Sequence, residues 1–197
     1  MKKNMIFDCS DTLLHMGAPE YLKSLVNDDD YANELHFRIF RSFPWHEYDC
    51  GKITSEELKQ QIIPLLKPEE YEVADTYLHN WNKHYSVIDG IPELLAELKE
   101  KGCKLYLLSD FPPCFEELWN KYDLFRLFDG RVISYEEGVR KSDEGALFKV
   151  LFKKNNLIPE ECIFVDDGQI NVDTAENLGL QGILFTDVPS LRKALGL

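Results

Sequence analysis

The sequence is short of positive charge. Its 197 residues include 22 Lys and Arg against 35 Asp and Glu, which gives a formal net charge of −13. Nucleic-acid binding depends on basic side chains that neutralise phosphates, so this balance argues against a nucleic-acid partner. An anionic substrate would be repelled by the mean field of the protein and would have to be attracted by a local cation.

Signals for membranes and export are also missing. No apolar run approaches the roughly 20 residues that cross a bilayer, and the apolar stretch 5–7 is too short for a signal sequence. The five cysteines are an odd number without C-x-x-C spacing, which favours reduced thiols that act as small hydrophobes. We therefore expect a cytoplasmic protein without a membrane partner, and the sequence leaves the oligomeric state open.

Strand-like and helix-like patterns alternate through most of the chain. Strand patterns cover 4–8, 103–110, 131–134, 161–167 and 182–185, and helical patterns cover 91–102, 112–125, 142–156, 171–180 and 190–196. Such alternation predicts an α/β fold, with a Rossmann-like parallel sheet and helices on both faces.

The alternation stops between Leu14 and about Ile88. The segments 19–26, 31–43, 55–66 and 68–85 all have helical apolar spacing, and the acidic run 28–30 is typical of a solvated connection between helices. The sequence thus predicts a catalytic core formed by 1–14 and 89–197, with a helical cap, 15–88, inserted after the first strand.

Polar side chains follow the predicted strands at their carboxyl ends. They are Asp8, Ser109, Asp110, Asp166 and Asp167, and a basic pair, Arg140 and Lys141, precedes the helix pattern at 142–156. Ligands of parallel sheets bind at this edge, and carboxylates suit a hard divalent cation. A cation and phosphate site is therefore expected there.

The order of these residues resembles the haloacid dehalogenase superfamily. Its four motifs have counterparts in "FDCSDTL", "LYLLSDF", "GVRKSDEGALF" and "FVDDGQINVDTA", and a helical cap between the first two is common in the family. The segments "FPWHEYDCGKIT" and "GVRKSDEGALFKVLF" are most similar to the branch of alpha-D-glucose-1-phosphate phosphatases. The resemblance implies a phosphatase that acts on a small phosphorylated metabolite, a sugar phosphate or a nucleotide.

The resemblance also assigns roles. It implies that Asp8 is the nucleophile and forms an aspartyl-phosphate, and that Mg²⁺ is held by Asp8, the backbone carbonyl of Ser10 and Asp167, with Asp166 orienting a bound water. Ser109 and Lys141 would hold the phosphoryl oxygens. Asp110, next to Ser109, is a further candidate for the phosphate-binding side.

Ser10 departs from the family pattern, in which a second Asp protonates the leaving group. A hydroxyl is a much weaker acid, and a missing general acid typically costs ~10² to 10⁴ in rate. Asp11 would face the other side of an extended strand and is a poor substitute. Three readings stay open: a phosphatase, slow or reliant on a good leaving group; a hydrolase of a phosphonate or carbon–halogen bond; and a non-catalytic phosphate-binding module.

Other polar and aromatic residues suggest structural roles. Asp11, Asp110 and Arg140 are of types that are more often solvated or capping. Four histidines have no metal-ligand spacing and are expected at the surface or in cap packing: His15, His46, His79 and His84. An aromatic set is expected to form cap core rather than substrate wall: Phe43, Trp45, Tyr48, Trp81 and Tyr85.

Overall fold

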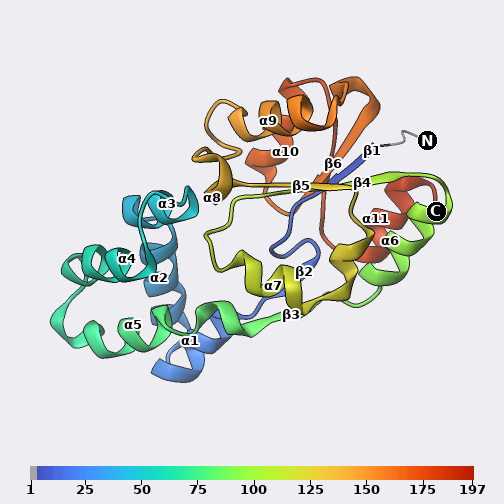
Figure 1. Cartoon of the computed structure of the whole chain (residues 1–197). Coiled ribbons are helices and arrows are strands. Elements are labelled where there is room, and N and C mark those ends of the chain that lie inside the picture. Colours follow the sequence, from blue (N-terminus) through green and yellow to red (C-terminus); the bar gives the residue numbers. More distant parts are fainter. Residues whose placement is uncertain (1–3) are drawn as a thin grey trace.

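A five-stranded parallel sheet forms the centre of the computed structural model, which describes residues 4–197 (Figure 1). Residues 1–3, the start of the predicted core segment 1–14, lie outside the described residues. In the order β5-β4-β1-β6-β7, the strands are β5 (Gly130–Ile133), β4 (Lys104–Ser109), β1 (Asn4–Phe7), β6 (Cys162–Asp166) and β7 (Gln181–Leu184). This arrangement confirms the predicted α/β fold, with the first strand in the middle of the sheet.

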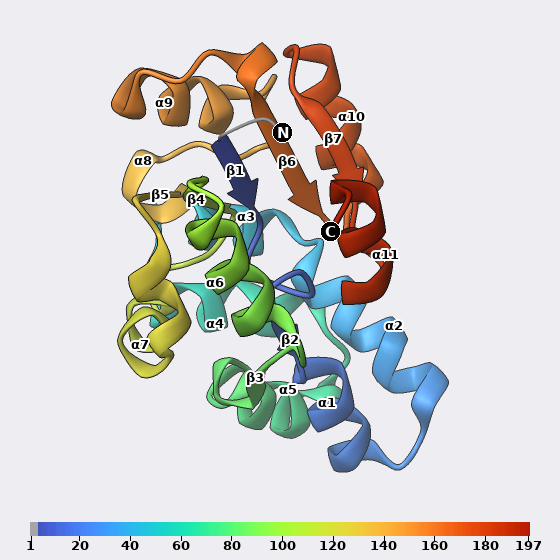
Figure 2. The ribbon, with the colours of Figure 1, turned by 90° about the vertical axis from the view of Figure 1, so that its right-hand side faces the viewer.

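Helices cover both faces of this sheet (Figures 1 and 2). Met5 and Phe7 of β1 enter one hydrophobic core, whereas Ile6 enters the other, because successive strand residues point to opposite faces. The first core is shared with α6 (Ile91–Glu100), α7 (Phe115–Lys121), η4 (Asp123–Leu127) and α11 (Val188–Leu195), and the second with α9 (Ala146–Asn155) and α10 (Gln169–Asn177). Two short elements complete this part: α8 (Ser134–Glu137) and η5 (Pro159–Glu161).

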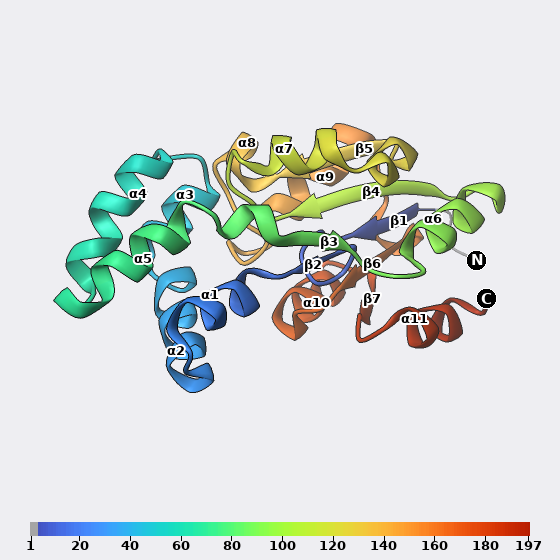
Figure 3. The same cartoon turned by 90° about the horizontal axis from the view of Figure 1, so that it is seen from below.

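The segment between β1 and α6 is mainly helical and lies to one side of the sheet (Figure 3). Its helices are α1 (Ala18–Val26), α2 (Asp29–Phe40), α3 (Phe43–Asp49), α4 (Ser55–Ile62), η1 (Ile63–Leu65), η2 (Pro68–Glu70), α5 (Tyr71–Leu78) and η3 (Trp81–His84). We call Ala18–His84 the helical insert. The sequence did not predict α3, which begins where the Ser42 hydroxyl accepts a hydrogen bond from the amide of Trp45.

Two chain segments connect the helical insert with the sheet, and they pair with each other. The antiparallel strands β2 (Leu14–Met16) and β3 (Tyr85–Val87) place Met16 opposite Tyr85. The sequence did not predict them, because three-residue strands show no measurable period. They lie near the ends of the predicted cap 15–88, whose limits stay a prediction.

Several smaller expectations can be compared with the structure. The run 28–30 is exposed, as expected, and Asp28 caps α2 by accepting a hydrogen bond from the amide of Tyr31 at 3.0 Å. No disulfide forms within residues 4–197, and Cys9, Cys50 and Cys103 are buried. None of the helices in this range has the length and apolar character needed to cross a membrane.

Glu70 is a buried carboxylate that holds two parts of the helical insert together. It is fully buried, and it accepts hydrogen bonds from the Arg38 guanidinium at 2.5 Å and the Tyr31 hydroxyl at 3.1 Å. It also accepts the amide hydrogen of Lys67 at 2.8 Å. The hydrogen bond from Arg38 is the main reason why the pKa of Glu70 falls from 4.5 to about 2.

We expect Glu70→Gln to destabilise the protein by about 2 kcal/mol at pH 7. Hydrogen bonds to charged groups contribute ~1.5 to 3 kcal/mol, and Arg38, which is partly exposed, recovers some hydration when its partner is lost. Because the folded pKa is depressed, this stability is present above about pH 4.5 and is lost as the pH falls toward 2. Urea unfolding at pH 7 and pH 3 measures both effects, with the exposed neighbour Glu69→Gln as the control. Equal unfolding midpoints for the parent and Glu70→Gln at pH 7 would contradict this account.

Candidate active site

Three carboxylates gather where β1 and β6 end. Asp8 directly follows β1, Asp166 ends β6 and Asp167 comes next. The strands pair in register, so the amide of Asp8 donates to the carbonyl of Val165 at 2.9 Å. One carboxylate oxygen from each Asp lies within 4.8 Å of the others. Parallel strands thus bring together acidic residues that are far apart in the sequence.

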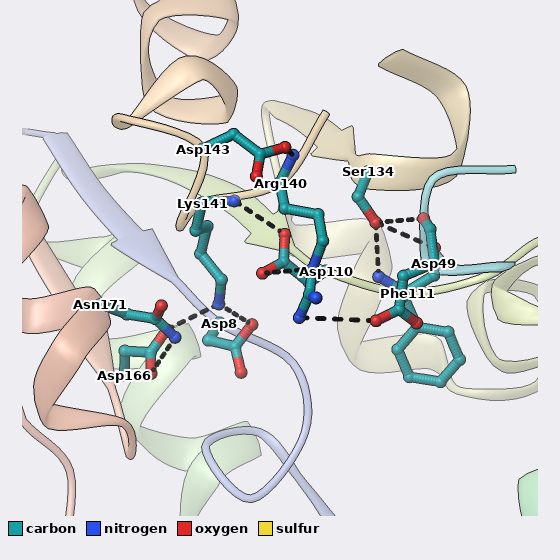
Figure 4. Close-up of polar contacts among 10 residues, drawn as sticks. All are labelled: Asp8, Asp49, Asp110, Phe111, Ser134, Arg140, Lys141, Asp143, Asp166 and Asn171. Atoms are coloured by element: carbon teal, nitrogen blue, oxygen red, sulfur yellow. Dashed lines mark hydrogen bonds and ion pairs between the residues drawn. The ribbon is translucent and has the colours of Figure 1, made fainter. Parts of the chain in front are cut away.

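The side chain of Lys141 reaches between two of these carboxylates, those of Asp8 and Asp166 (Figure 4). Its side chain is buried, and its Nζ donates to Asp8 Oδ1 and to Asp166 Oδ2, both at 2.7 Å. Its amide donates to Asp110 Oδ1 at 2.9 Å, which fixes the backbone from which the side chain extends. Burial by itself would lower the pKa of Lys141, but Asp166 and Asp8 outweigh it and raise that pKa above its usual range. Lys141 is therefore a buried, permanently charged ammonium.

The carboxylates outnumber this single ammonium. Burial, with the charges of Asp166 and Asp167 added, raises the pKa of Asp8 from 3.8 to about 8, although Lys141 opposes the shift. Burial and Asp166 likewise raise the pKa of Asp167 to about 6. The cluster carries more negative charge than the protein compensates, which is the electrostatic condition of a site for a divalent cation.

Asp166 is held by donors that the sequence analysis did not consider. Asn171 Nδ2 lies 3.0 Å from both of its carboxylate oxygens, and the Gly168 amide donates to Oδ1 at 2.7 Å. Both donors lie at the start of α10, where amide groups without helical partners point outward. The sequence contained one signal for this contact: Asn171 lies five residues after Asp166, in the first turn of the predicted helix.

Ser109, the last residue of β4, lies at the same edge of the sheet. The β1–β4 register pairs Phe7 with Leu107, so Asp8 and Ser109 follow neighbouring parallel strands at the same carboxyl edge. Ser109 is 1% exposed, and its hydroxyl oxygen has no hydrogen-bond partner within residues 4–197. Buried hydroxyls nearly always have a partner, so this one is available to a ligand.

Ser10 and Asp11 diverge directly after Asp8. The Ser10 hydroxyl lies 3.1 Å from the Tyr85 hydroxyl. Asp11, in a left-handed conformation at φ 51°, accepts the amide hydrogen of Met16 at 2.9 Å and is paired with His15. The carboxylate of Asp11 therefore serves the start of the helical insert, which fits its exclusion from the site.

Arg140 and Asp110 require a correction, because neither is a solvated surface group. The Arg140 guanidinium lies between Asp110 and Asp49, at 3.7 and 3.6 Å (Figure 4). Burial raises the pKa of Asp110, and it raises the pKa of Asp49 to about 8. No sequence pattern pointed to Asp49, because α3 brings it to the sheet only in the folded chain. The assignment of Asp110 to phosphate binding stays a prediction.

A pocket of about 180 Å³ separates the helical insert from the sheet edge. Its polar wall contains Ser10, Asp49, Asp110 and Arg140. Trp45, Trp81 and Tyr85 are buried in the hydrophobic core, as expected, and they also line this pocket. Whether they contact a substrate stays a prediction. Phe43 is 70% exposed and belongs to neither class. Helical periodicity indicated which aromatic residues face inward. It could not show that a cavity lies between the helical insert and the edge of the sheet.

The predicted histidines lie away from the carboxylate cluster. His15 and His79 are exposed and pair with Asp11 and Asp75, and His84 stacks on Tyr21 with ring centroids 4.0 Å apart. His46 is partly buried. These positions agree with the expected surface and packing roles.

Comparisons with known proteins support this geometry. A model of haloacid dehalogenase-like hydrolases matches residues 2–179. The sesquiterpene phosphatase astK of Aspergillus oryzae is 30% identical over 176 residues, which cover 89% of each chain. The drimenol cyclase drtB of Aspergillus calidoustus is 28% identical over 99% of this chain, which spans only 36% of the cyclase.

A solved structure has the same fold. A HAD family enzyme from Bacteroides thetaiotaomicron, in complex with magnesium and inorganic phosphate, superimposes with a TM-score of 0.69 at 23% identity over 94% of each chain. The narrower resemblance to alpha-D-glucose-1-phosphate phosphatases stays a prediction. Because the family model covers most of the chain, this protein belongs to the haloacid dehalogenase-like hydrolases.

Proposed function

We propose that this hydrolase is a Mg²⁺-dependent phosphatase that cleaves a small phosphomonoester through an aspartyl-phosphate on Asp8. The observation that carries the proposal is the position of Lys141 Nζ, 2.7 Å from both Asp8 and Asp166 in a cluster with a third carboxylate. The Ser109 hydroxyl, at the same edge of the sheet, has no hydrogen-bond partner among the described residues. A nucleophile, an acidic cation site and two groups for phosphoryl oxygens thus share one edge of the sheet.

The donor set suits magnesium. Mg²⁺ prefers oxygen ligands and keeps several waters, so one or two protein carboxylates and a carbonyl are sufficient. Asp8, the Ser10 carbonyl and Asp167 would hold the ion, with Asp166 held in orientation by Asn171. When bound, Mg²⁺ would neutralise the excess carboxylate charge and reduce the repulsion between Asp8 and a phosphate.

The chain supplies a nucleophile and groups for the phosphoryl oxygens, whereas proton transfer has no carboxyl group at Ser10. An Asp8 carboxylate oxygen attacks phosphorus, the Asp8–phosphorus bond forms, and the bond from phosphorus to the leaving oxygen breaks. Water then attacks phosphorus, the Asp8–phosphorus bond breaks, and inorganic phosphate leaves with the oxygen of the water, whose surplus proton passes to phosphate or solvent, so Asp8 is restored as a carboxylate. Lys141 and Ser109 hold the phosphoryl oxygens, where charge develops during both transfers.

The two other readings have different expected products. A carbon–halogen hydrolase would release halide and has no use for the acidic pair Asp166 and Asp167, which argues against it. A binding module would bind inorganic phosphate without turnover. The sesquiterpene phosphatase relative supports the phosphomonoesterase.

A metal-dependence assay tests the proposal. With p-nitrophenyl phosphate, whose leaving group needs no proton, we expect phosphate release with Mg²⁺ and a fall of at least ~10² after EDTA, because bound metal supplies several kcal/mol of charge stabilisation. Added Mg²⁺ should restore the rate. Metal-independent release would remove the carboxylate cluster from the mechanism, and halide release from 2-chloropropionate instead would favour the dehalogenase reading.

A further inference from the structure

The pocket between the helical insert and the sheet begins at the proposed reaction centre. Ser10, two residues after Asp8, lines it together with Asp110 and Arg140, the neighbours of Ser109 and Lys141. A phosphate attacked by Asp8 would thus have its leaving group directed into this pocket. The shape and chemistry of the pocket therefore bear on which leaving group the enzyme accepts.

Aromatic rings form most of the pocket wall. The Phe40 ring is stacked on Trp45 with centroids 3.8 Å apart, and the Trp81 ring lies 5.1 Å from Trp45 and 5.9 Å from Phe111. The Tyr85 ring lies 5.5 Å from that of Phe111. The rings thus offer aromatic faces and edges on one side of the pocket, against which a further flat ring can pack in the same geometries.

Hydrogen bonds fix this wall across the two parts of the chain. The Ser134 hydroxyl donates to the backbone carbonyl of Asp49 at 2.6 Å and accepts the amide hydrogen of Phe111 at 2.8 Å. Ser134 is fully buried. The polar and aromatic sides of the pocket are thus joined at α8, so the pocket is a preformed feature.

The volume limits the size of the group that can be enclosed. An apolar cavity of about 150 Å³ holds one benzene molecule, and this pocket measures about 180 Å³. A single substituted ring fits it, whereas a nucleoside would extend beyond it. The Arg140 guanidinium lies in the polar wall of the pocket, where its Nε faces Asp110 Oδ2 at 3.7 Å, so it presents a positive charge to a substituent on such a ring.

The polar groups around Ser10 favour a leaving group that departs without a proton. The Ser10 and Tyr85 hydroxyls face each other at 3.1 Å where the family pattern has a carboxyl group, and hydroxyls are far weaker acids. A phenol has a pKa of about 10, against about 16 for water and alkyl alcohols. An aryl oxide can therefore leave where an alkoxide cannot.

Two observations lead to one inference: the small aromatic pocket, and the hydroxyl of Ser10 where a carboxyl group would be needed. Resting on the proposed function, we infer that the enzyme acts on compact aryl phosphates, with one substituted aromatic ring as the leaving group. The sugar phosphate or nucleotide expected from the sequence is the alternative substrate class that the turnover test below distinguishes. Phe40, Trp45, Trp81 and Phe111 would contact the ring, and Arg140 would bind its substituent.

Binding measurements test whether the pocket recognises the aromatic ring, independently of how readily an aryl oxide leaves. Phenylphosphonate and methylphosphonate share a head group, and calorimetry with Mg²⁺ should show at least ~10-fold tighter binding of the phenyl compound. Phe40→Ala, at a partly exposed position, should remove most of that difference without affecting methylphosphonate. The matched control is Phe43→Ala, at an exposed position, which should keep the affinity difference between the two phosphonates. Thermal melting of both variants checks that they are folded. Equal affinity of the two phosphonates for the parent protein would overturn the inference.

Turnover provides a second test. With Mg²⁺, we expect phenyl phosphate to exceed cyclohexyl phosphate and glucose 1-phosphate in kcat/KM by at least ~10², and Ser10→Asp to narrow the gap to cyclohexyl phosphate by about tenfold. A preference for glucose 1-phosphate would overturn the inference while the proposed function stands. If acetyl phosphate and every ester are inert although phenylphosphonate still binds more tightly, the proposed function fails and the ring pocket stands.

Discussion

Asp8→Asn should reduce phosphate release from p-nitrophenyl phosphate by at least ~10⁴-fold. Removing the nucleophile of an enzyme with a covalent intermediate costs on the order of 10⁶ in kcat, and an amide oxygen cannot form a hydrolysable acyl phosphate. The side chain keeps its shape, so Lys141 still has an acceptor at this position and a full partner in Asp166. The loss would therefore report chemistry rather than packing.

Stability provides the folding control for Asp8→Asn. Burial raises the pKa of Asp8 from 3.8 to about 8, so the folded protein binds this proton more tightly than the unfolded chain. Without a cation, the free energy of unfolding should fall as the pH rises from about 4 to 8, because Asp8 must ionise in a buried site. Asn does not ionise, so the variant avoids this loss of stability. The melting temperature of Asp8→Asn in EDTA at pH 8 should therefore be no lower than that of the parent.

The matched substitution is Asp11→Asn, three residues away. Its left-handed backbone tolerates Asn, and the amide oxygen can still accept the amide hydrogen of Met16. We expect its turnover to stay within about threefold of the parent, because the half-exposed carboxylate of Asp11 is bonded to Met16 and His15 rather than to the carboxylate cluster. Turnover of Asp8→Asn within tenfold of the parent would exclude Asp8 as the nucleophile.

Lys141→Ala should lower kcat by at least ~10² to 10³, the usual cost of removing one group that stabilises developing charge. It should also destabilise the cation-free protein by about 3 to 5 kcal/mol, because Asp8 and Asp166 lose their shared buried partner. Added Mg²⁺ should recover part of that stability, since it binds the same carboxylates. Kinetics and thermal melting, each with and without Mg²⁺, measure the two effects.

Two further variants sharpen this test. Lys141→Arg should restore the stability better than the rate, because a planar fork cannot replace a compact ammonium that lies 2.7 Å from two carboxylates. The control is Lys149→Ala, at an exposed position on the following helix α9, which should leave both the stability and the rate unchanged. If Lys141→Ala kept its kcat, the charge on the phosphoryl oxygens would have to be met by other groups.

The sequence by itself determined the parallel sheet and the residues that end its strands. Local patterns suffice for this, because the strand pattern 161–167 contains a continuous apolar run, 162–165, that stops at Asp166. Parallel pairing then requires Asp8, Ser109 and Asp166 to lie at one edge. The same patterns could not place the breaks in 112–125, where Tyr122 is extended between α7 and η4.

Only the tertiary structure decided what surrounds those strand ends. Lys141 reaches Asp8 across 133 positions of sequence, and Asp49 meets Arg140 because α3 packs beside α8, contacts that no local period encodes. The pocket likewise exists only where the helical insert meets the sheet edge, so its volume and its aromatic wall depend on how the two parts of the chain are held together. Helical spacing tells which side chains face inward. It does not tell whether the space they face is filled by protein or left for a substrate.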